Sequence, residues 1–220
     1  MKDGFTIEQI ELRRALPKVF EGEAARSSEV WRRDLTLSRG SRVIIAAESG
    51  TGKSSLCAYI YGNRNDYAGE ILFNGRDIRE LTVDQWQALR RRHLAYLPQE
   101  LSLFPELTAL QNIELKNRLT DHLKPGRIRE MLEMLGIQDR ADFPVGKMSI
   151  GQQQRVGIIR ALAQPFDFLL LDEPVSHLDE TNNRIVARLV AEEASRQGAA
   201  VIATSVGNHL QIEGAEMLKL

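Results

Sequence analysis

Residues 47–54 carry the clearest chemical pattern in the sequence. They follow an apolar, β-branched run and precede a stretch that we expect to be helical, which is the setting of a loop that binds phosphate through backbone amides. Gly50 and Gly52 let the backbone turn its N–H groups toward an anion, because a side chain at either position would obstruct the approach. We expect the Lys53 ammonium to reach the β- and γ-phosphates of a nucleotide, and the Ser54 hydroxyl to bind Mg²⁺.

The usual phosphate-loop pattern begins with glycine, and Ala47 stands at that position. The alanine methyl group restricts positive φ, so we expect an altered entry into the loop and a retained site. The other residues that we assign to this site are Glu48, Ser49, Thr51 and Ser55. The alternative interpretation is an ordinary turn rich in glycine and serine.

Two adjacent acids, Asp172 and Glu173, follow the apolar run 168–171 at the point where we expect burial to end. The pattern predicts that Asp172 holds a magnesium ion and that Glu173 polarises an attacking water. Neighbouring side chains on a strand point to opposite faces, so the strand must break for both acids to serve one site, and Pro174 supplies that break. The alternative is a strand that ends in two solvated acids.

The elements that must position these residues follow from the apolar periodicity. Short buried strands alternate with helical segments, which predicts an α/β fold with a parallel sheet covered on both faces. Residues 1 to about 45 mix short apolar stretches with turn residues and predict a small β region. We expect strands at 42–46, 168–171 and 200–203, a strand and turn at 69–75, and helices at 52–61, 83–92 and over most of 108–135, with a turn at Pro125 and Gly126 and a stop at Gly136.

Composition narrows the class of protein. A chain of 220 residues buries about 70% of its unfolded surface, so a full core is available without disulfides. The 29 lysines and arginines against 30 acids give a formal charge of −1, which argues against a protein held on nucleic acid by bulk charge. The single cysteine excludes an intramolecular disulfide and a cysteine-based zinc site. No apolar run approaches a membrane span and residues 1–4 lack the core of a secretory signal, so we expect a cytoplasmic protein.

Three further features receive a structural interpretation. The basic run 90–93 has the composition of a nucleic-acid or lipid contact, but we interpret it as the solvated face of a polar helix. We expect Cys57 to pack inertly in the helix after the phosphate loop. Trp31 and Trp86 lack an aromatic partner pattern, so we assign them no ligand role.

Additional motifs resemble those of the ATP-binding subunit of ABC transporters and occur in that family's order. Residues 96–99 resemble its Q-loop, residues 148–155 its signature and residues 176–179 its D-loop. Phe20 lies where the family places an aromatic ring that stacks on adenine. The resemblance extends from about residue 10 to residue 220. Together these motifs are far more specific than any one of them.

The resemblance implies a P-loop NTPase core with a parallel sheet, an antiparallel β region near the N-terminus and an inserted helical subdomain. We expect residues 1–98 and 161–220 to form the ATP-binding core, and residues 99–160 to form the helical subdomain that carries the signature. ATP and Mg²⁺ are the implied cofactors, and Gln99 is the implied sensor of magnesium and of the attacking water.

The signature has a physical meaning of its own. Ser149 is placed to N-cap a helix that begins near Gln152, which leaves free amides and a positive dipole end for an anion. The resemblance implies that this anion is the γ-phosphate held by Lys53 of a second copy or of a paired nucleotide-binding subunit. Two ATP molecules then join two subunits head to tail. Ser149, Gly151, Gln152 and Asp179 are the residues that we expect to reach across.

The sequence departs from the family pattern at two positions. Ile150 replaces the first glycine of the signature pair, and Ser205 stands where the family presents a switch histidine. His209 lies four residues further on, and the two interpretations are a substitute from a shifted loop or a plain surface residue. Loss of the switch function slows hydrolysis and spares ATP binding, so we predict an ATPase, slow if Ser205 has no substitute.

The segment after the Q-loop is where the family receives a helix from its integral membrane subunit. We expect exposed Leu101, Phe104 and Leu107 to form that docking surface, which places the chain on the inner face of the cell membrane through its partner. The alternative is that these residues pack under the subdomain. Two functions remain open, namely the ATP-hydrolysing subunit of a transporter and a slow or non-hydrolysing clamp that regulates a membrane partner. The short chain resembles subunits for lipoprotein release or macrolide efflux.

Overall fold

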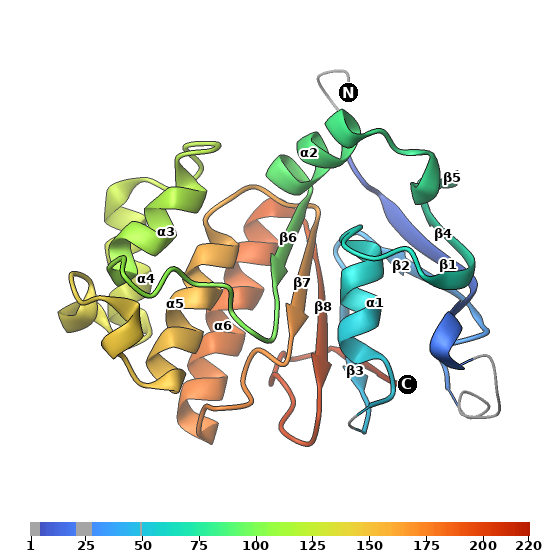
Figure 1. The fold of residues 1–220 in the computed structure, drawn as a ribbon. Helices are drawn as coiled ribbons and strands as arrows, with labels where there is room; N and C mark the ends of the chain where they lie inside the picture. Colours follow the sequence, from blue (N-terminus) through green and yellow to red (C-terminus); the bar gives the residue numbers. More distant parts are fainter. Residues whose placement is uncertain (1–4, 21–27, 49) are drawn as a thin grey trace.

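The computed structural model describes residues 5–20, 28–48 and 50–220. A parallel sheet in the order β6-β7-β8-β3-β9 forms its centre, and an antiparallel sheet in the order β2-β1-β4-β5 lies to one side (Figure 1). The parallel strands are β3 (Arg42–Ala46), β6 (Leu94–Leu97), β7 (Phe168–Asp172), β8 (Ala200–Ser205) and β9 (Glu216–Lys219). The antiparallel strands are β1 (Gln9–Pro17), β2 (Asp34–Ser38), β4 (Tyr67–Phe73) and β5 (Arg76–Asp77). The predicted α/β class, with a small β region near the N-terminus, is confirmed.

The helices occupy the two sides of the parallel sheet. The α-helices are α1 (Lys53–Ile60), α2 (Val83–Arg92), α3 (Ala109–Asn117), α4 (Pro125–Met134), α5 (Ile150–Leu162) and α6 (Glu180–Gln197). Short 3₁₀ turns are η1 (Lys18–Phe20), η3 (Ile78–Glu80), η4 (Gln138–Arg140) and η5 (Val145–Lys147). Three of the helices, α3, α4 and α5, lie between β6 and β7 in the chain and form the helical part at the left of Figure 1. None of the described helices is both long and apolar enough to cross a bilayer.

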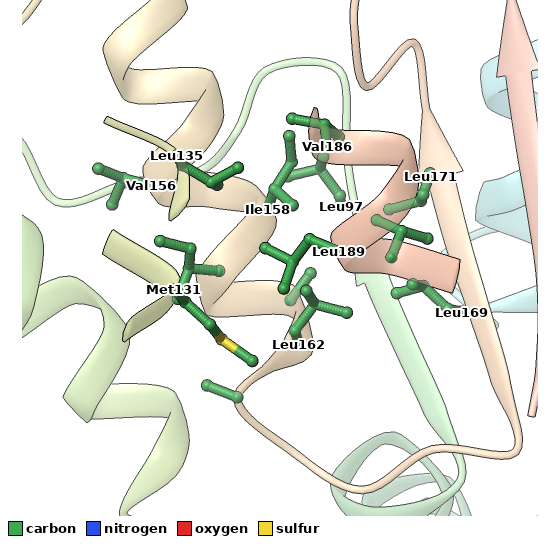
Figure 2. Close-up of a cluster of buried hydrophobic side chains, with 14 of the residues drawn as sticks. Leu97, Met131, Leu135, Val156, Ile158, Leu162, Leu169, Leu171, Val186 and Leu189 are labelled. Carbon is green, nitrogen blue, oxygen red and sulfur yellow. The ribbon is translucent and has the colours of Figure 1, made fainter. Parts of the chain in front are cut away.

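The central strand β7 supplies alternate residues to two hydrophobic clusters. Leu169 and Leu171 belong to the cluster on the side of α5 and α6, whereas Phe168 and Leu170 belong to the cluster formed with α1 and the antiparallel sheet. This alternation is the period-2 geometry of a strand that is buried on both faces. Figure 2 shows the first cluster, to which the strands contribute Leu97 of β6 and Leu169 and Leu171 of β7. The helices contribute Met131 of α4, Leu135 directly after α4, Val156, Ile158 and Leu162 of α5, and Val186 and Leu189 of α6.

The ends of the helices follow local sequence signals. Thr82, Thr108 and Ser149 each form a reciprocal capping box with the residue three positions on. The predicted stop at Gly136 is confirmed, since this glycine adopts φ 62° and its N–H donates to the Glu133 carbonyl at 2.8 Å. The predicted turn at Pro125 is wrong because Pro125 is the first residue of α4, where a missing N–H costs no helical hydrogen bond.

The prediction of a solvated basic face at residues 90–93 holds for Arg91 and Arg92, which are exposed, and is wrong for Arg90 and His93, which are half-buried. The Arg90 guanidinium donates to the carbonyls of Tyr61 and Gly62 at 3.0 and 2.8 Å and lies over the Trp86 ring. Arg91 Nε donates to the Leu119 carbonyl at 2.7 Å, and His93 Nδ1 lies 2.7 Å from an Asp167 carboxylate oxygen. Arg90, Arg91 and His93 satisfy carbonyl and carboxylate groups of other segments, so these three residues hold α2 to its neighbours.

Candidate functional site

The phosphate-loop candidate joins the end of β3 to the start of α1. Gly50 and Gly52 have φ of 83° and 96°, the left-handed region that favours glycine. Gly52 has a second reason to be glycine, because a Cβ there would lie 2.9 Å from a ring carbon of Phe20. No side chain caps α1 among the described residues, so its first backbone N–H groups remain available to an anion. Ser49 lies outside the described residues.

Lys53 is the first residue of α1, and its side chain is almost fully buried. Its ammonium donates to the Glu48 carbonyl at 2.9 Å and lies 3.8 Å from the Glu173 carboxylate. The loop lysine and the second acid of the predicted pair, 120 positions apart in the chain, therefore meet. A buried ammonium with one hydrogen bond and one ion pair keeps donor capacity for an incoming anion.

Lys53 and Glu173 belong to a polar cleft of about 270 Å³. Ser54 also lines it, and its Oγ lies 3.5 Å from Gln99 Oε1. The full lining consists of Phe20, Gly50, Gly52, Lys53, Ser54, Ser55, Gln99 and Glu173. Thr51 lies next to this lining and is anchored by its side chain, which donates to the Glu48 carbonyl at 2.8 Å. The structure thus brings together most of the residues that the sequence analysis assigned to one binding site.

The two acids are separated by a break in the backbone. Asp172 is the last residue of β7 and is buried, and Thr204 Oγ1 donates to its carboxylate at 2.6 Å. Glu173 adopts φ 53°, which for a residue with a side chain costs about 1–3 kcal/mol. The break therefore falls at Glu173 itself, one residue before the predicted Pro174. It turns Glu173 into the cleft, whereas Asp172 is not among the lining residues.

Ser205 closes β8 beside the loop entry, where its carbonyl accepts the Ala47 N–H at 3.1 Å. Its hydroxyl lies 2.5 Å from His209 Nδ1. The interpretation of His209 as a plain surface residue is wrong, because the histidine is half-buried and paired. The loop that carries it is tied down by Asn208, whose amide donates to the Val175 and Leu178 carbonyls at 3.0 and 3.3 Å.

The signature residues form a separate group. Ser149 is the N-cap of α5, as predicted, but the helix begins at Ile150, earlier than expected. The Gln152 N–H donates to Ser149 Oγ at 3.3 Å, and the Gln152 side chain accepts the Ser149 N–H at 3.0 Å. A Cβ at Gly151 would lie 3.1 Å from the His177 carbonyl, so glycine allows α5 to approach the segment before α6.

Asp179 belongs to the same group and caps α6, where it accepts the Asn182 N–H at 2.8 Å. This backbone hydrogen bond, together with the Asn182 side chain, lowers the pKa of the Asp179 carboxyl. None of Ser149, Gly151, Gln152 and Asp179 lines the cleft around Lys53. A single copy of the chain therefore does not bring the two groups of predicted site residues together.

The prediction that Leu101 is an exposed docking residue is wrong. Its side chain is only 8% exposed, because it packs in the core between the end of β6 and Gly157 of α5. Leu107 is half-buried, and Phe104 is 48% exposed. Of the three apolar side chains, Phe104 is the one that presents a large accessible surface.

Three residues support the site without having been singled out for it. Thr204 holds Asp172, and the Trp31 indole N–H donates to the Thr51 carbonyl at 3.0 Å. The Gln154 amide donates to the Glu173 carbonyl at 2.9 Å, and its oxygen accepts the His177 N–H at 3.2 Å. Thr204 had a detectable signal, because it is a polar residue at the end of the apolar run 200–203. Nothing in the run of three glutamines at 152–154 marks Gln154 as the buried one.

Comparison with known families decides the identity. The family model described as ABC transporter matches residues 32–176. This chain belongs to the ABC transporter family. It is an ATP-binding cassette, and the cleft around Lys53 and Glu173 lies largely within the matched region.

Curated relatives of this cassette include macrolide-export proteins. It is 36% identical to the macrolide export ATP-binding/permease protein MacB of Rhodopseudomonas palustris strain HaA2 over 90% of this chain and 30% of that relative. It is 34% identical to the MacB protein of Bartonella henselae over 77% of this chain and 26% of that relative. The cassette thus spans less than a third of the length of these relatives.

Solved structures of ABC cassettes share its fold. The dimeric, post-hydrolysis structure of the cassette MJ0796 bound to ADP and Pi superposes with a TM-score of 0.75 at 27% identity, covering 89% of this chain and 87% of that one. A putative ABC transporter ATP-binding protein from Pyrococcus furiosus superposes with a TM-score of 0.74 at 21% identity over 96% and 97% of the two chains, a likeness of fold.

Proposed function

We propose that this cassette binds and hydrolyses ATP, dimerises around two ATP molecules and drives a separate membrane subunit. The observation that carries the proposal is the meeting of Lys53, Glu173, Gln99 and Phe20 in one polar cleft. A lysine, an acid, an amide and an aromatic ring from four separate segments are the groups that a nucleoside triphosphate and its hydrolysis require.

In the proposed binding mode, the adenine of ATP lies at Phe20 and its phosphates lie at the start of α1. Phe20 lies against Gly52 and offers a ring face for adenine, while the phosphates reach the amino end of α1. Lys53 then exchanges the Glu48 carbonyl for phosphate oxygens, which are stronger acceptors of an ammonium proton.

The oxygen atoms on the cleft wall suit a magnesium ion. Ser54 Oγ and Gln99 Oε1 lie 3.5 Å apart. Mg²⁺ prefers oxygen ligands, and in nucleotide sites one or two protein groups and the nucleotide phosphates usually supply them. We assign Ser54 and Gln99 on the cleft wall to this role, together with Asp172, which lies at the end of β7 and does not line the cleft. When bound, Mg²⁺ supplies positive charge that neutralises the β- and γ-phosphate oxygens.

Glu173 is the proposed catalytic residue. Its carboxylate accepts a hydrogen bond from a water that attacks the γ-phosphorus, the bond to the bridging oxygen breaks, and ADP leaves. Ser205, at the end of the neighbouring strand, presents its hydroxyl together with His209. A clamp that binds ATP and hydrolyses it slowly is the second candidate, favoured by the serine at the position where the family presents a histidine.

The second group of site residues supports dimerisation. Ser149, Gly151, Gln152 and Asp179 lie outside the cleft of their own chain, and a second copy placed head to tail would present them to its γ-phosphate. The two uncapped N–H groups at Ile150 and Gly151 then serve as anion donors. The dimeric MJ0796 structures support this arrangement.

The MacB relatives are ATP-binding/permease proteins, which supports coupling to a membrane subunit at the inner face of the cell membrane. We assign this coupling to a helical subdomain at residues 99–160, inserted into an ATP-binding core at 1–98 and 161–220. Phe104 and half-buried Leu107 are the retained docking residues.

Phosphate release by the chain in complex with its membrane subunit separates the two candidate functions. A wild-type complex that turns over ATP, and a Glu173→Gln complex that binds ATP but loses turnover, support the transporter subunit. Negligible turnover of the wild-type complex with retained ATP binding supports the clamp. Calorimetry that detects no ATP binding by the wild-type chain overturns both.

A further inference from the structure

A separate cleft, of about 350 Å³, lies between the chain that leaves α1, the start of β4 and the turn that leads into α2. The residues that line it come from two stretches, 62–67 and 78–86. None of them lines the cleft around Lys53. A cleft of this volume is large enough for a small organic ligand or a lipid headgroup.

Two arginines line this cleft, and none of its lining residues carries a carboxylate. Arg79 Nε and Nη2 donate to the Asp77 carboxylate at 3.0 and 2.6 Å, whereas its Nη1 has no hydrogen-bond partner among the described residues. Arg64 Nε and Nη2 donate in the same way to the Asp66 carboxylate at 2.9 and 2.5 Å. Each aspartate orients its guanidinium but does not line the cleft, so the remaining N–H groups are available to a ligand.

A pair of tyrosine rings supports the two guanidinium groups. The guanidinium carbon of Arg64 lies 5.3 Å from the centre of the Tyr59 ring, and that of Arg79 lies 5.6 Å from the centre of the Tyr67 ring. The centres of the two rings lie 4.9 Å apart. Contact with a ring and pairing with an aspartate both limit the motion of an arginine, so these donors are positioned before a ligand binds.

The hydroxyl of Tyr67 points to a missing ligand. Tyr67 lines the cleft and is only 3% exposed, yet its buried hydroxyl has no hydrogen-bond partner among the described residues. Tyr59, in the same ring pair, donates to the Asp66 carbonyl at 3.2 Å. Burial raises the pKa of the Tyr67 phenol to about 12, so this hydroxyl is a donor at physiological pH. A buried donor without an acceptor costs free energy, and an acceptor bound in the cleft would remove that cost.

The polar groups of the lining favour a phosphate group as that acceptor. Donors come from the side chains of Arg64, Arg79, Tyr67, Asn63 and Asn65. A phosphate group presents more oxygen atoms to such a set than a carboxylate does, and the planar fork of a guanidinium matches its geometry. Two guanidinium groups in one cleft also repel each other, and an anion between them relieves that repulsion.

Apolar side chains lie next to these donors. Leu81 and Trp86 line the cleft and are half-buried. A Cβ at Gly62 would lie 2.5 Å from the Trp86 ring, so the indole is packed against the backbone and this part of the lining is fixed. Val83, two positions after Leu81, is 83% exposed. A molecule that carries apolar groups beside its phosphate would contact both kinds of surface.

We propose that this cleft is a second anion site, which binds a phosphate group through Tyr67, Arg64 and Arg79. The phosphate comes either from a phospholipid headgroup or from a free phosphate in solution. The inference goes beyond the proposed function, because the site is separate from the nucleotide cleft and requires no hydrolysis of ATP. Arg64 Nη1 also donates to Ser55 Oγ at 2.9 Å, and Ser55 lines the cleft around Lys53. Tyr67 and Arg79 are therefore the residues to replace.

Vesicle flotation of the full chain tests the headgroup as the source. The probes are vesicles of phosphatidylcholine and phosphatidylglycerol in a ratio of about three to one, and vesicles of phosphatidylcholine alone. Tyr67→Phe and Arg79→Gln should each weaken binding to the anionic vesicles about fivefold or more. Tyr67→Phe keeps the charge of the chain and removes a hydroxyl that has no partner, so it should not destabilise the fold. Arg188→Gln is the matched control, since Arg188 is 77% exposed and also pairs with an acid, Glu192.

Titration with inorganic phosphate tests the other source. The chain has two tryptophans, of which Trp86 lines this cleft and Trp31 packs against Gly52 at the nucleotide site. In a Trp31→Phe background the tryptophan fluorescence therefore reports on this cleft alone. Inorganic phosphate should change that fluorescence, and Tyr67→Phe in the same background should raise the phosphate dissociation constant about fivefold or more.

The two measurements separate the possible results. Binding to anionic vesicles that depends on Tyr67 and Arg79, without a response to inorganic phosphate, identifies a lipid headgroup. A response to inorganic phosphate without vesicle binding identifies a soluble phosphate ligand. The inference is overturned if Tyr67→Phe behaves as wild type with both probes, or if Arg188→Gln weakens vesicle binding as much as Arg79→Gln does. Thermal unfolding of each variant shows that it is folded, and ATP binding by the wild-type chain tests the proposed function independently.

Discussion

The Ser205 hydroxyl lies 2.5 Å from Nδ1 of His209, at the carboxyl end of β8 and next to the strand end that carries Asp172. The serine is buried, and the histidine comes from a loop fastened by Asn208. A hydroxyl paired with an imidazole at this place can present a hydrogen bond to the phosphate that we propose the neighbouring loop binds.

The pair is tested by removing its imidazole. We expect His209→Ala to lower kcat for ATP hydrolysis by about tenfold or more and to leave the ATP dissociation constant unchanged, because the pair acts after binding. His122→Ala is the matched control, since that half-buried histidine lies between α3 and α4. Equal rates for wild type and His209→Ala would assign the pair a purely structural role.

The strained backbone at Glu173 predicts that a glycine variant is more stable than an alanine variant at this position. Glu173→Gly should unfold with a free energy about 1 kcal/mol higher than Glu173→Ala, because glycine adopts φ 53° without the steric cost of a Cβ. Both variants remove the carboxylate near Lys53, so that loss cancels in the comparison. Urea denaturation of the two proteins measures the difference. An alanine variant as stable as the glycine variant would show that this backbone carries no strain.

Replacement of Gly52 is predicted to impair the protein through both backbone strain and a steric clash. Gly52→Ala should weaken ATP binding at least tenfold and destabilise the fold by about 1–3 kcal/mol, because its Cβ would meet Phe20 at 2.9 Å and its φ is 96°. Gly75→Ala is the control for backbone strain alone, since Gly75 has φ 78° and no atom within 4 Å of an added Cβ. Calorimetric ATP titration and thermal unfolding of both variants make the comparison, and equal ATP affinities would argue against the clash.

The hydrogen bond from Thr204 to buried Asp172 should contribute measurably to stability. Thr204→Val should lower the free energy of unfolding by about 1–3 kcal/mol, because a buried carboxylate loses its 2.6 Å donor. Thr120→Val is the matched control, since Thr120 Oγ1 is buried without a hydrogen-bond partner among the described residues. That control should be neutral or slightly stabilising. A neutral Thr204→Val variant would mean that Asp172 finds another donor.

Local signals in the sequence were sufficient to predict the strands and the helix cap that position the site residues. The apolar runs that became β3 and β7 were predicted almost to the residue, and Ser149 was predicted as the N-cap of α5. In each case the determining chemistry, a period of burial or a capping side chain, is contained within a few consecutive residues.

Most of the errors concern side-chain contacts that the local sequence does not reveal. Leu101 was expected on the surface because the family resemblance places a docking surface there, yet Gly157 of α5 leaves the space that buries it. His209 and Arg90 were interpreted from their polar surroundings, and their partners lie 4 and 28–29 positions away in the chain. Such pairings depend on the tertiary arrangement, which the identity of a residue does not encode.

The alternation of β7 between two hydrophobic clusters has a final consequence for the acids at its end. A shift of this strand by one position would exchange Leu169 and Leu171 with Phe168 and Leu170, and both packed interiors would receive side chains of the wrong shape. A single inserted or deleted residue in β7 would therefore displace Asp172 and Glu173 only by disrupting both interiors at once. The packing of both faces of β7 therefore fixes the position at which the carboxylates of Asp172 and Glu173 leave the strand.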